Sequence, residues 1–258
     1  MVESGLTAPE VGFFAGPLPR ILAHRGLATT APENTLLAFA AAIALGITHL
    51  ETDVHASKDG IAVISHDADL ARTAGIAGRI DEFPFTELQK VDLGYGQNYP
   101  GLQEALLAFP EARFNIDLKS DAAVAPTVDA IRSAQATRRV LVTSFDNARR
   151  QRAVRLLPGV ATSASALPFS VALVAVKIGI IPLARHLLRG VQAVQVPERM
   201  WGVRVISPRS VRLLKRASVE VHVWTINDPV DMRRLLNLGV DGLVTDRADV
   251  ALGVIAAE

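Results

Sequence analysis

Cysteine is absent from the 258 residues of the chain. A disulfide, a thiolate nucleophile and a Cys-ligated metal are therefore excluded. A chain that uses no disulfide suits a reducing compartment, so we expect a cytoplasmic protein, with association to a membrane as an open alternative.

The chain also lacks an excess of one charge sign, because 27 Lys and Arg residues stand against 26 Asp and Glu residues. A net charge of +1 does not indicate a broad basic face, so no nucleic-acid partner is expected, although net charge does not report on a local patch. Glu3 and Glu10 precede the first basic residue, whereas a secretory leader begins with positive charge. The sequence therefore predicts no signal peptide.

A long hydrophobic run is missing as well. The most apolar region, 169–184, is interrupted by Lys177 and contains Pro182, and it falls short of the roughly 20 apolar residues that a spanning helix needs. We expect a buried helix of the fold over 169–188. A helix that contacts a membrane surface or a partner is the alternative.

Apolar strand-like runs alternate with helical patterns along the chain. Strands are expected at Ile21–His24, His49–Val54, Phe114–Leu118, Val140–Thr143, Gly159–Thr162, Ala193–Val196, Val219–Thr225 and Gly242–Thr245. Helices are expected at Asn34–Ala44, Leu102–Ala108, Ala123–Ala134, Asn147–Leu156, Phe169–Leu188, Pro208–Arg216, Pro229–Leu238 and Asp249–Ile255. Eight such units, with strands apolar on both faces, predict an α/β protein with a (β/α)8 TIM-barrel fold and one domain over residues 1–258.

One segment, 56–101, interrupts this alternation after the second strand. It contains a hairpin-like KDGIAVISHD and then charged and Gly-rich stretches. Long excursions of this kind are usually functional, and loops that follow barrel strands form the active face. We therefore expect this insertion to lie over the active site and to bring His66 and Asp67 to it.

Acidic side chains gather at the predicted carboxyl ends of two strands. Glu51 and Asp53 are two residues apart on one strand and so point to the same face, and Asp117 ends the neighbouring strand. Carboxylates placed together repel one another unless a cation or protons intervene. An oxygen-rich site of this type predicts one hard divalent cation, Mg²⁺ or Ca²⁺.

Cationic and titratable groups gather at the same ends. Arg25 and Lys119 suit a phosphate group, while His24 and His66 titrate near neutral pH and are able to move protons. Together with a metal, these groups indicate phosphoester chemistry, in which one imidazole takes a proton and the other gives one to the leaving alkoxide. Trp224, Asn227 and Asp246 also fall at strand ends, whereas the remaining histidines, His49, His55, His186 and His222, are expected to be structural.

Several ordered motifs in the chain resemble those of one known family. They are HRG at 24–26, APENT at 31–35, ETDV at 51–54, KDG at 58–60, SHD at 65–67, VHVWTIND at 221–228 and GVDGLVTDRAD at 239–249. The series is similar to that of the glycerophosphodiester phosphodiesterase family and covers nearly the whole chain. The resemblance implies a (β/α)8 barrel that uses a divalent cation to hydrolyse glycerophosphodiesters to glycerol 3-phosphate and an alcohol.

The resemblance also implies residue roles. His24 and His66 would be the acid and base, Glu51 and Asp53 metal ligands, and Arg25 and Lys119 the phosphate-binding cations. Glu33 would lie near the metal and catalytic centre, Asn34 would cap the following helix, and Trp224 would line the alcohol side of the pocket. The family usually has Glu-Ile-Lys where this chain has Asp117-Leu118-Lys119, and the shorter acid places the identity and strength of metal binding in question.

Two rival functions remain open. Lysophospholipase D and sphingomyelinase D enzymes share the paired histidines and metal carboxylates, and the uncharged stretch 156–176 and the segment 194–201 offer a lipid-side surface. The second rival is a barrel that binds phosphoesters without catalysis, because a fold alone does not establish activity. The attacking hydroxyl, from water or from the substrate itself, is also left open.

Overall fold

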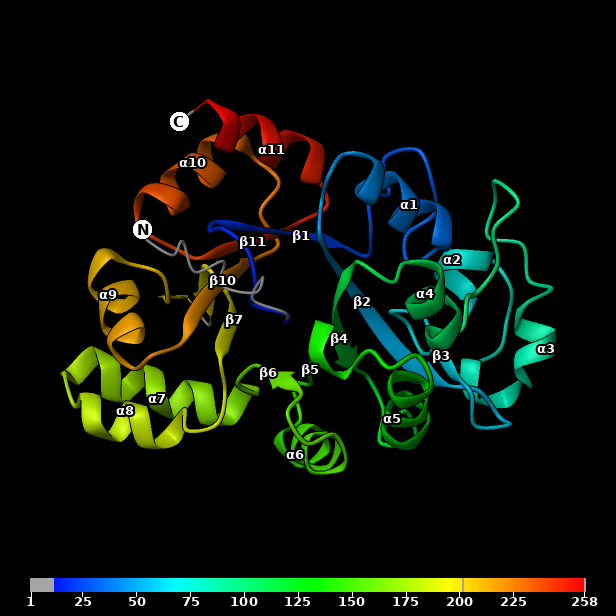
Figure 1. Ribbon diagram of the computed structural model, residues 1–258, viewed down its shortest axis with the longest axis horizontal. Helices are drawn as coiled ribbons and strands as arrows, with labels where there is room; N and C mark the ends of the chain where they lie inside the picture. Colours follow the sequence, from blue (N-terminus) through cyan, green and yellow to red (C-terminus); the bar gives the residue numbers. More distant parts are fainter. Residues whose placement is uncertain (1–11, 201, 258) are drawn as a thin grey trace, which may run out of the picture.

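The computed structural model describes residues 12–200 and 202–257. Its described residues contain eight parallel strands that form the centre of the molecule (Figure 1). These are β1 (Arg20–His24), β2 (His49–Ala56), β4 (Arg113–Leu118), β5 (Val140–Thr143), β6 (Ala161–Thr162), β7 (Ala193–Pro197), β10 (Glu220–Trp224) and β11 (Gly242–Thr245). Their order, β6-β5-β4-β2-β1-β11-β10-β7, confirms the predicted (β/α)8 barrel.

Helices surround the strands (Figure 1). They are α1 (Leu36–Ala44), α4 (Leu102–Ala108), α5 (Val124–Ser133), α6 (Asn147–Leu156), α7 (Ala166–Ile178), α8 (Ile181–Leu187), α9 (Pro208–Arg216), α10 (Pro229–Asn237) and α11 (Ala248–Ala256). Every residue of β2 and β11 is buried, because one face of each strand lies against the helices and the other faces the inside of the barrel.

The single helix predicted over 169–188 is wrong. The chain forms two helices there, because Gly179 adopts a φ of +84° and ends α7, and Pro182 lies in the first turn of α8. One side of α7 is buried, including Phe169, and the other side is exposed. The predicted burial of this region is therefore correct for one side of the helix only.

The barrel closes incompletely between β6 and β7. The strand β6 has two residues, and Ser163 and Ala193 form an isolated bridge where a longer ladder would close the sheet. The Gln192 side chain accepts a hydrogen bond from the Thr162 N–H at 2.9 Å, which replaces one strand-to-strand contact. A short hairpin that the sequence did not predict, β8 (Arg199–Met200) with β9 (Val203–Arg204), follows β7.

The N-terminal segment crosses the amino ends of the strands. The buried Phe13 packs its ring edge-on against His49, the first residue of β2, and its carbonyl accepts a hydrogen bond from His49 Nε2 at 2.8 Å. Arg20 pairs with Glu220 at the start of β10, at 2.8 Å. This end of the barrel is therefore filled, and the functional groups lie at the other end.

The insertion after β2 forms a small layer of its own. The strand β3 (Ala62–Ile64) pairs antiparallel with β2, as the hairpin pattern predicts, and is followed by α2 (Ala71–Ala74), the 3-10 helix η1 (Ile80–Glu82) and α3 (Phe85–Leu88). A separate buried cluster that includes Leu70, Leu88 and Tyr99 holds this layer together. The hairpin ends beside the carboxyl end of β2, where the Ser65 N–H donates to the Asp53 carbonyl at 3.0 Å.

Candidate active site

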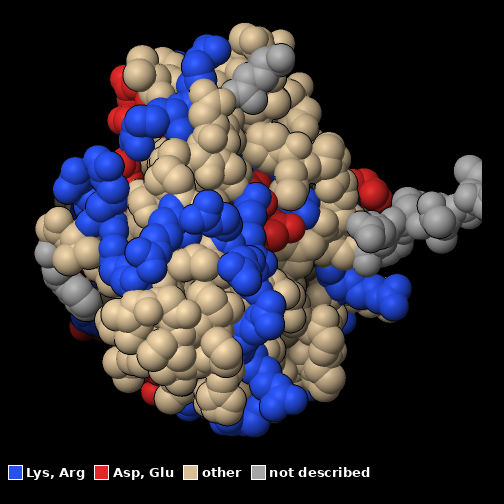
Figure 2. All heavy atoms as spheres, turned by 90° about the vertical axis from the view of Figure 1, so that its left-hand side faces the viewer, with Lys and Arg blue, Asp and Glu red and all other residues tan. Residues whose placement is uncertain are grey.

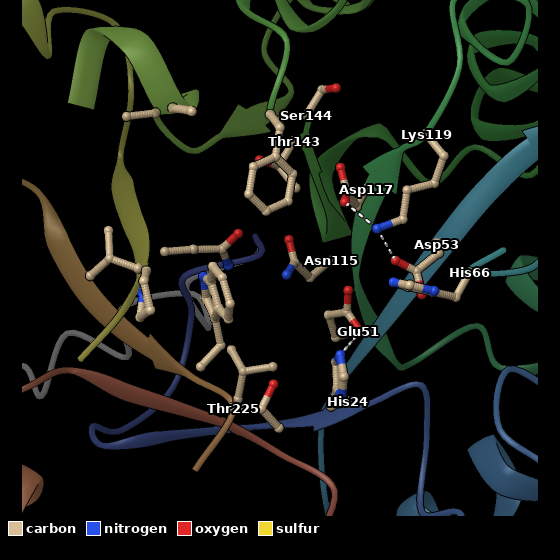
Figure 3. A pocket seen from close by; sticks show the side chains of 18 of the residues that line it. His24, Glu51, Asp53, His66, Asn115, Asp117, Lys119, Thr143, Ser144 and Thr225 are labelled. Carbon is tan, nitrogen blue, oxygen red and sulfur yellow. Dashed lines mark hydrogen bonds and ion pairs between the residues drawn. The ribbon is translucent and has the colours of Figure 1, made fainter. Parts of the chain in front are cut away.

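A cavity of about 410 Å³ lies at the carboxyl ends of the barrel strands. Eight of the residues singled out from the sequence line it, and Figure 3 shows the acidic, imidazole and lysine side chains among them pointing toward one another. The eight are His24, Arg25, Glu51, Asp53, His66, Asp117, Lys119 and Trp224. The sequence thus predicts most of the cavity's charged groups, because the carboxyl ends of parallel strands meet at one mouth.

The backbone of the HRG turn explains why its third residue is glycine. Arg25 has a φ of +58° and Gly26 a φ of +83°, so the chain turns sharply as β1 ends. A Cβ on Gly26 would lie 2.7 Å from the carbonyl carbon of Ala38 in α1, a contact that real side chains do not make. The turn also lets the Arg25 N–H donate to the Glu51 carbonyl at 3.0 Å, which fixes β1 against β2.

Each cavity imidazole is held by a carboxylate. His24 Nδ1 lies 2.6 Å from Asp246 Oδ1, and His66 Nδ1 lies 2.7 Å from Asp67 Oδ1. Burial lowers the pKa of His24, but the hydrogen bond to Asp246 and the charge of Glu51 outweigh it, so that this pKa is raised above its ordinary value. With Nδ1 occupied, Nε2 of each ring is the atom that remains for a proton exchange with a ligand.

Lys119 lies between two of the three predicted metal ligands. Its Nζ is 2.8 Å from Asp53 Oδ1 and 2.8 Å from Asp117 Oδ2, and both contacts are drawn in Figure 3. Although burial opposes the change, Lys119 and Arg25 lower the pKa of Asp53. Burial prevails at Asp117 and raises its pKa despite Lys119. The predicted phosphate-binding cation is thus already paired with acid groups.

Among the described residues, no lysine or arginine side chain pairs with Glu51 as Lys119 and Arg25 pair with Asp53. The imidazole of His24 lies beside Glu51, with Nε2 3.9 Å from Glu51 Oε2. Burial, together with the charges of Asp53 and Asp117, raises the pKa of Glu51 to about 8. A carboxyl group in this position retains its proton near neutral pH unless a further cation arrives.

The donor set suits a hard cation in its chemistry. Within the part of the chain that the structure describes, Asp117 Oδ1 is buried without a hydrogen-bond partner, and Glu51 has the raised pKa just described. Carboxylate oxygens of this kind are ligands for Mg²⁺ or Ca²⁺. Among residues 12–200 and 202–257, no three His, Asp or Glu side chains stand in the arrangement of a coordination sphere, and Lys119 pairs with two of the acids.

Glu33 and Asn34 do not line the cavity of the described chain, but each contacts a side chain that does. Glu33 Oε1 accepts hydrogen bonds from Arg25 Nη1 at 2.9 Å and from Arg72 Nη2 at 2.6 Å. Arg72, which the sequence reading missed, also donates to Asp67 and so connects α2 of the insertion to the partner of His66.

The expectation that Asn34 caps the helix is wrong. The helix begins at Leu36, and Thr35 Oγ1 accepts the hydrogen bond from the Ala38 N–H at 3.3 Å. Asn34 instead has a φ of +57° and donates from Nδ2 to Asp53 Oδ2 at 3.1 Å. Its short amide tolerates this left-handed backbone and holds a carboxylate in place.

Two further groups of cavity residues were predicted incompletely or not at all from the sequence. Asn115 stands opposite Glu51 in the ladder of β2 and β4, just as Asp117 stands opposite Asp53, so the alternation rule applied to β4 would have found it. The second group forms an apolar wall, in which Phe145 and Trp224 meet edge-on at 6.1 Å. Phe169, Val196, Pro197 and Met200 complete this wall. The sequence predicts Trp224 as a pocket residue and the segment 194–201 as part of a lipid-side surface. It does not mark Phe145 or Phe169 as cavity residues, because apolar residues at these places read as barrel core.

The four histidines expected to be structural lie outside the cavity wall of the described chain. His55 Nε2 donates to the His66 carbonyl at 3.2 Å and so supports the hairpin that carries His66. His222 is fully buried and lies 3.0 Å from Glu220.

The imidazoles, carboxylates and cations at this barrel mouth are the groups that hydrolysis of a phosphoric diester needs, and comparisons with known proteins identify the family. Residues 24–250 match the model described as the glycerophosphoryl diester phosphodiesterase family. The chain belongs to this family, as the motifs in its sequence imply.

Individual relatives agree with this membership. A Mycobacterium tuberculosis protein named probable glycerophosphodiester phosphodiesterase 2 is 41% identical over 252 residues, which are 97% of this chain and 96% of that protein. A solved phosphodiesterase of Oleispira antarctica, in complex with the product sn-glycerol-3-phosphate, is 28% identical with a TM-score of 0.79 and covers 93% of this chain and 97% of that one. A Rattus norvegicus lysophospholipase D is 37% identical over 115 residues, which are 40% of this chain and 37% of that protein.

Proposed function

We propose that the protein hydrolyses glycerophosphodiesters to glycerol 3-phosphate and an alcohol. One observation carries this proposal: two imidazoles, each oriented through Nδ1 by a carboxylate, line the same cavity as Arg25 and Lys119. The product bound to the Oleispira antarctica phosphodiesterase supports the same class of substrate.

His24 and His66 carry out the proton transfers in this proposal. One imidazole takes the proton of the attacking hydroxyl, and the other gives a proton to the leaving alkoxide, which is too basic to depart unprotonated. Asp246 and Asp67 orient the rings and stabilise their protonated forms, and they remain ionised. Product analysis in water enriched in heavy oxygen distinguishes attack by water from attack by a substrate hydroxyl.

We further infer that one divalent cation, Mg²⁺ or Ca²⁺, binds at Glu51, Asp53 and Asp117. The raised pKa of Glu51 and the unpartnered Asp117 Oδ1 support this inference. When bound, the cation neutralises charge on the phosphate and lowers the pKa of the attacking hydroxyl. Arg25 and Lys119 bind phosphate oxygens through donors that are not used by their carboxylate partners.

Substitution of the two imidazoles tests the catalytic assignment. We expect His24→Ala and His66→Ala each to lower kcat on glycerophosphocholine by about 10²- to 10⁴-fold, with an unchanged melting temperature. His186→Ala, at an exposed position on α8, is the matched control and should keep full activity. Near-normal turnover in either cavity variant would remove that histidine from the mechanism.

Thermal denaturation tests the cation site without measuring turnover. At about 100 times its dissociation constant, an ion that binds only the folded protein stabilises it by about 2.7 kcal/mol, so Mg²⁺ or Ca²⁺ should raise the melting temperature. Glu51→Gln should abolish the rise, whereas Glu87→Gln, at an exposed position on α3, should retain it. A melting temperature that is the same in chelator and in either ion would contradict the site.

A lysolipid is the second candidate substrate, and the apolar wall of the cavity favours it. Phe145, Phe169, Met200 and Trp224 offer contacts to an acyl chain that glycerophosphocholine cannot fill. Hydrolysis of glycerophosphocholine without detergent supports the small diester, and turnover restricted to lysolipid dispersions supports the lipid.

A further inference from the structure

The outward side of α7 is a stripe of exposed aliphatic side chains. Leu167, Val171, Val174 and Ile178 recur at helical spacing on this side, and Leu167 is 72% and Ile178 63% exposed. The opposite side of the helix is buried against the barrel. A helix that is apolar on all sides is normally covered on all sides, so the exposed stripe indicates an interaction surface.

The stripe continues onto α8 and reaches the mouth of the cavity. Ile180 and Leu183 extend it past Gly179, and both are more than 40% exposed. At its other end, Ala166 and Phe169 of α7 line the cavity. We call Leu167, Val171, Val174, Ile178, Ile180 and Leu183 the apolar face.

Cations border the apolar face. Lys177 Nζ donates to the Arg204 carbonyl at 2.9 Å, which places the β8–β9 hairpin against the end of α7. Arg209 also reaches this end, since its Nη2 lies 3.9 Å from the position of a Cβ on Gly179. Arg204 and Arg209 are exposed.

Charge along the chain is strongly segregated. Residues 147–219 contain thirteen Lys and Arg residues and a single acid, Glu198, which pairs with Arg234 at 2.7 Å. The other 185 residues contain fourteen Lys and Arg residues and twenty-five acids. Figure 2 shows the side of the molecule that carries α8 and α9, where Lys and Arg form a band around a tan area and Asp and Glu are sparse.

We propose that the apolar face docks the protein on an anionic lipid membrane, with the cavity mouth beside the lipid headgroups. The aliphatic side chains enter the boundary between headgroups and acyl chains, while the bordering cations lie level with the lipid phosphates. Docking of this kind presents membrane diesters to the site, and that use of it rests on the proposed function.

The surroundings of the apolar face favour a membrane over other occupants. A second copy of the chain would bring the same cations together across a two-fold interface, where like charges repel. A nucleic acid would use the cations, but it would leave the six aliphatic side chains in water. Lipid satisfies both features, since it offers negative charge above an apolar layer.

Sedimentation with vesicles tests the proposal on the intact chain. Vesicles of phosphatidylcholine with phosphatidylglycerol should bind the protein at low salt, and vesicles of phosphatidylcholine alone should bind it about tenfold less or weaker. Val174→Gln with Ile178→Gln, and separately Arg204→Glu with Arg209→Glu, should each weaken binding to the anionic vesicles about tenfold or more. Salt at about 0.5 M should also weaken it, because it screens the cations.

Matched double variants elsewhere on the surface control for fold and charge. Leu107→Gln with Val230→Gln replaces exposed aliphatic side chains on α4 and α10, and Lys58→Glu with Lys90→Glu reverses exposed cations of the insertion. Both controls should bind vesicles like the parent chain. All of the variants should hydrolyse soluble glycerophosphocholine at the parent rate, since none of the altered residues lines the cavity.

Three results would overturn the proposal. One is the absence of binding to anionic vesicles at low salt. Another is binding that the Val174→Gln, Ile178→Gln variant leaves unchanged. The third is a dimer or a complex with single-stranded RNA that these substitutions disrupt while vesicle binding is missing. Because vesicle binding is measured without substrate, a failure of the proposed hydrolysis leaves this result standing.

Discussion

Single carboxylates orient the two imidazoles of the cavity. Asp246 accepts a hydrogen bond from His24 and another from Asn227 Nδ2 at 2.7 Å, so its own position is fixed by β11 and by the loop after β10. Asp67 is fixed in the same way between His66 and Arg72. In the proposed mechanism, the geometry of proton transfer therefore depends on Asp246 and Asp67, which do not themselves exchange protons with the ligand.

Asp246→Asn tests this dependence. Asparagine keeps the size of the side chain but removes the charge that stabilises a protonated His24, so we expect kcat to fall about tenfold or more with little change in KM. Nitrogen-15 NMR of the imidazole should show that His24 loses its fixed tautomer. Asp129→Asn, at an exposed site on α5, should change neither quantity, and an unaltered kcat in Asp246→Asn would exclude the orienting role.

The side chains that the sequence predicts best are charged ones at strand ends. Glu51, Asp53 and Asp117 were found because strand alternation and parallel pairing fix their positions. The role of Asn34 was missed, because an asparagine just before a helix is typical of a cap, and the sequence does not reveal that its backbone is left-handed. Arg72 is close in the chain to Asp67 but 39 residues from Glu33, and no local pattern encodes the longer contact.

The N-terminal segment seals one end of the barrel through His49. Its Nε2–H donates to the Phe13 carbonyl, so its Nδ1 is unprotonated and accepts a hydrogen bond from Thr48 Oγ1 at 2.9 Å. Burial lowers the pKa of His49 to about 4 from 6.5, and the charges of Arg20, Arg113 and His222 add to this effect. The folded protein therefore resists protonation at this ring.

The stability of the protein should consequently fall as the pH drops from 6.5 toward 4. In this range the unfolded chain binds a proton at His49 and the folded chain does not, which costs up to about 3 kcal/mol of the unfolding free energy. In urea denaturation at several pH values, the unfolding free energy of His49→Gln should fall less steeply with decreasing pH than that of the parent. The exposed variant His186→Gln should behave like the parent. Equal slopes in His49→Gln and the parent would show that His49 does not titrate in this way.

The boundary between α7 and α8 depends on one glycine. Gly179 has a φ of +84°, so Gly179→Ala should lower the unfolding free energy by about 1 kcal/mol. Gly253→Ala is the matched control, since Gly253 lies inside α11 with open space around its missing Cβ, and it should raise stability by about 0.5–1 kcal/mol. Opposite signs in chemical denaturation are the expected outcome, and a gain in both variants would contradict the account of the boundary.

Helices and strands were predictable where their periodicity is long, and less so where a single residue sets the boundary. The patterns for α5 and α6 placed both helices within two residues of their observed limits. The apolar pattern of 169–188 continues across Gly179 without a change, so the pattern of hydrophobic residues does not reveal the boundary between α7 and α8. The two-residue strands β8 and β9 are too short to carry any periodic pattern.

The barrel as a whole is least continuous between β6 and β7. Ladders of four to six paired positions join β4 to β2 and β5, whereas β6 and β7 meet through one bridge and a few bonds around Gln192. Stability is not uniform across a fold, and regions with fewer shared hydrogen bonds open at lower free energy.

Hydrogen exchange should therefore detect this seam. We expect the amides of Ala164 and Gln192, which bond across the seam, to exchange faster than amides in the centre of β2 and β4. Mass spectrometry of peptides from both regions gives the comparison, with helix α5, which is buried on one side, as an internal reference. Equal protection at the seam and in β2 would mean that the barrel opens only by global unfolding.

The chain's near-zero net charge conceals an uneven distribution of charge, because Lys and Arg dominate residues 147–219 and Asp and Glu outnumber them elsewhere. Such a molecule is not inert toward charged surfaces at its isoelectric point. A cation-exchange resin and an anion-exchange resin should each retain it there, through different parts of its surface. Near a charged surface, the electric field would rotate the protein before the two make contact, so the protein would arrive already oriented.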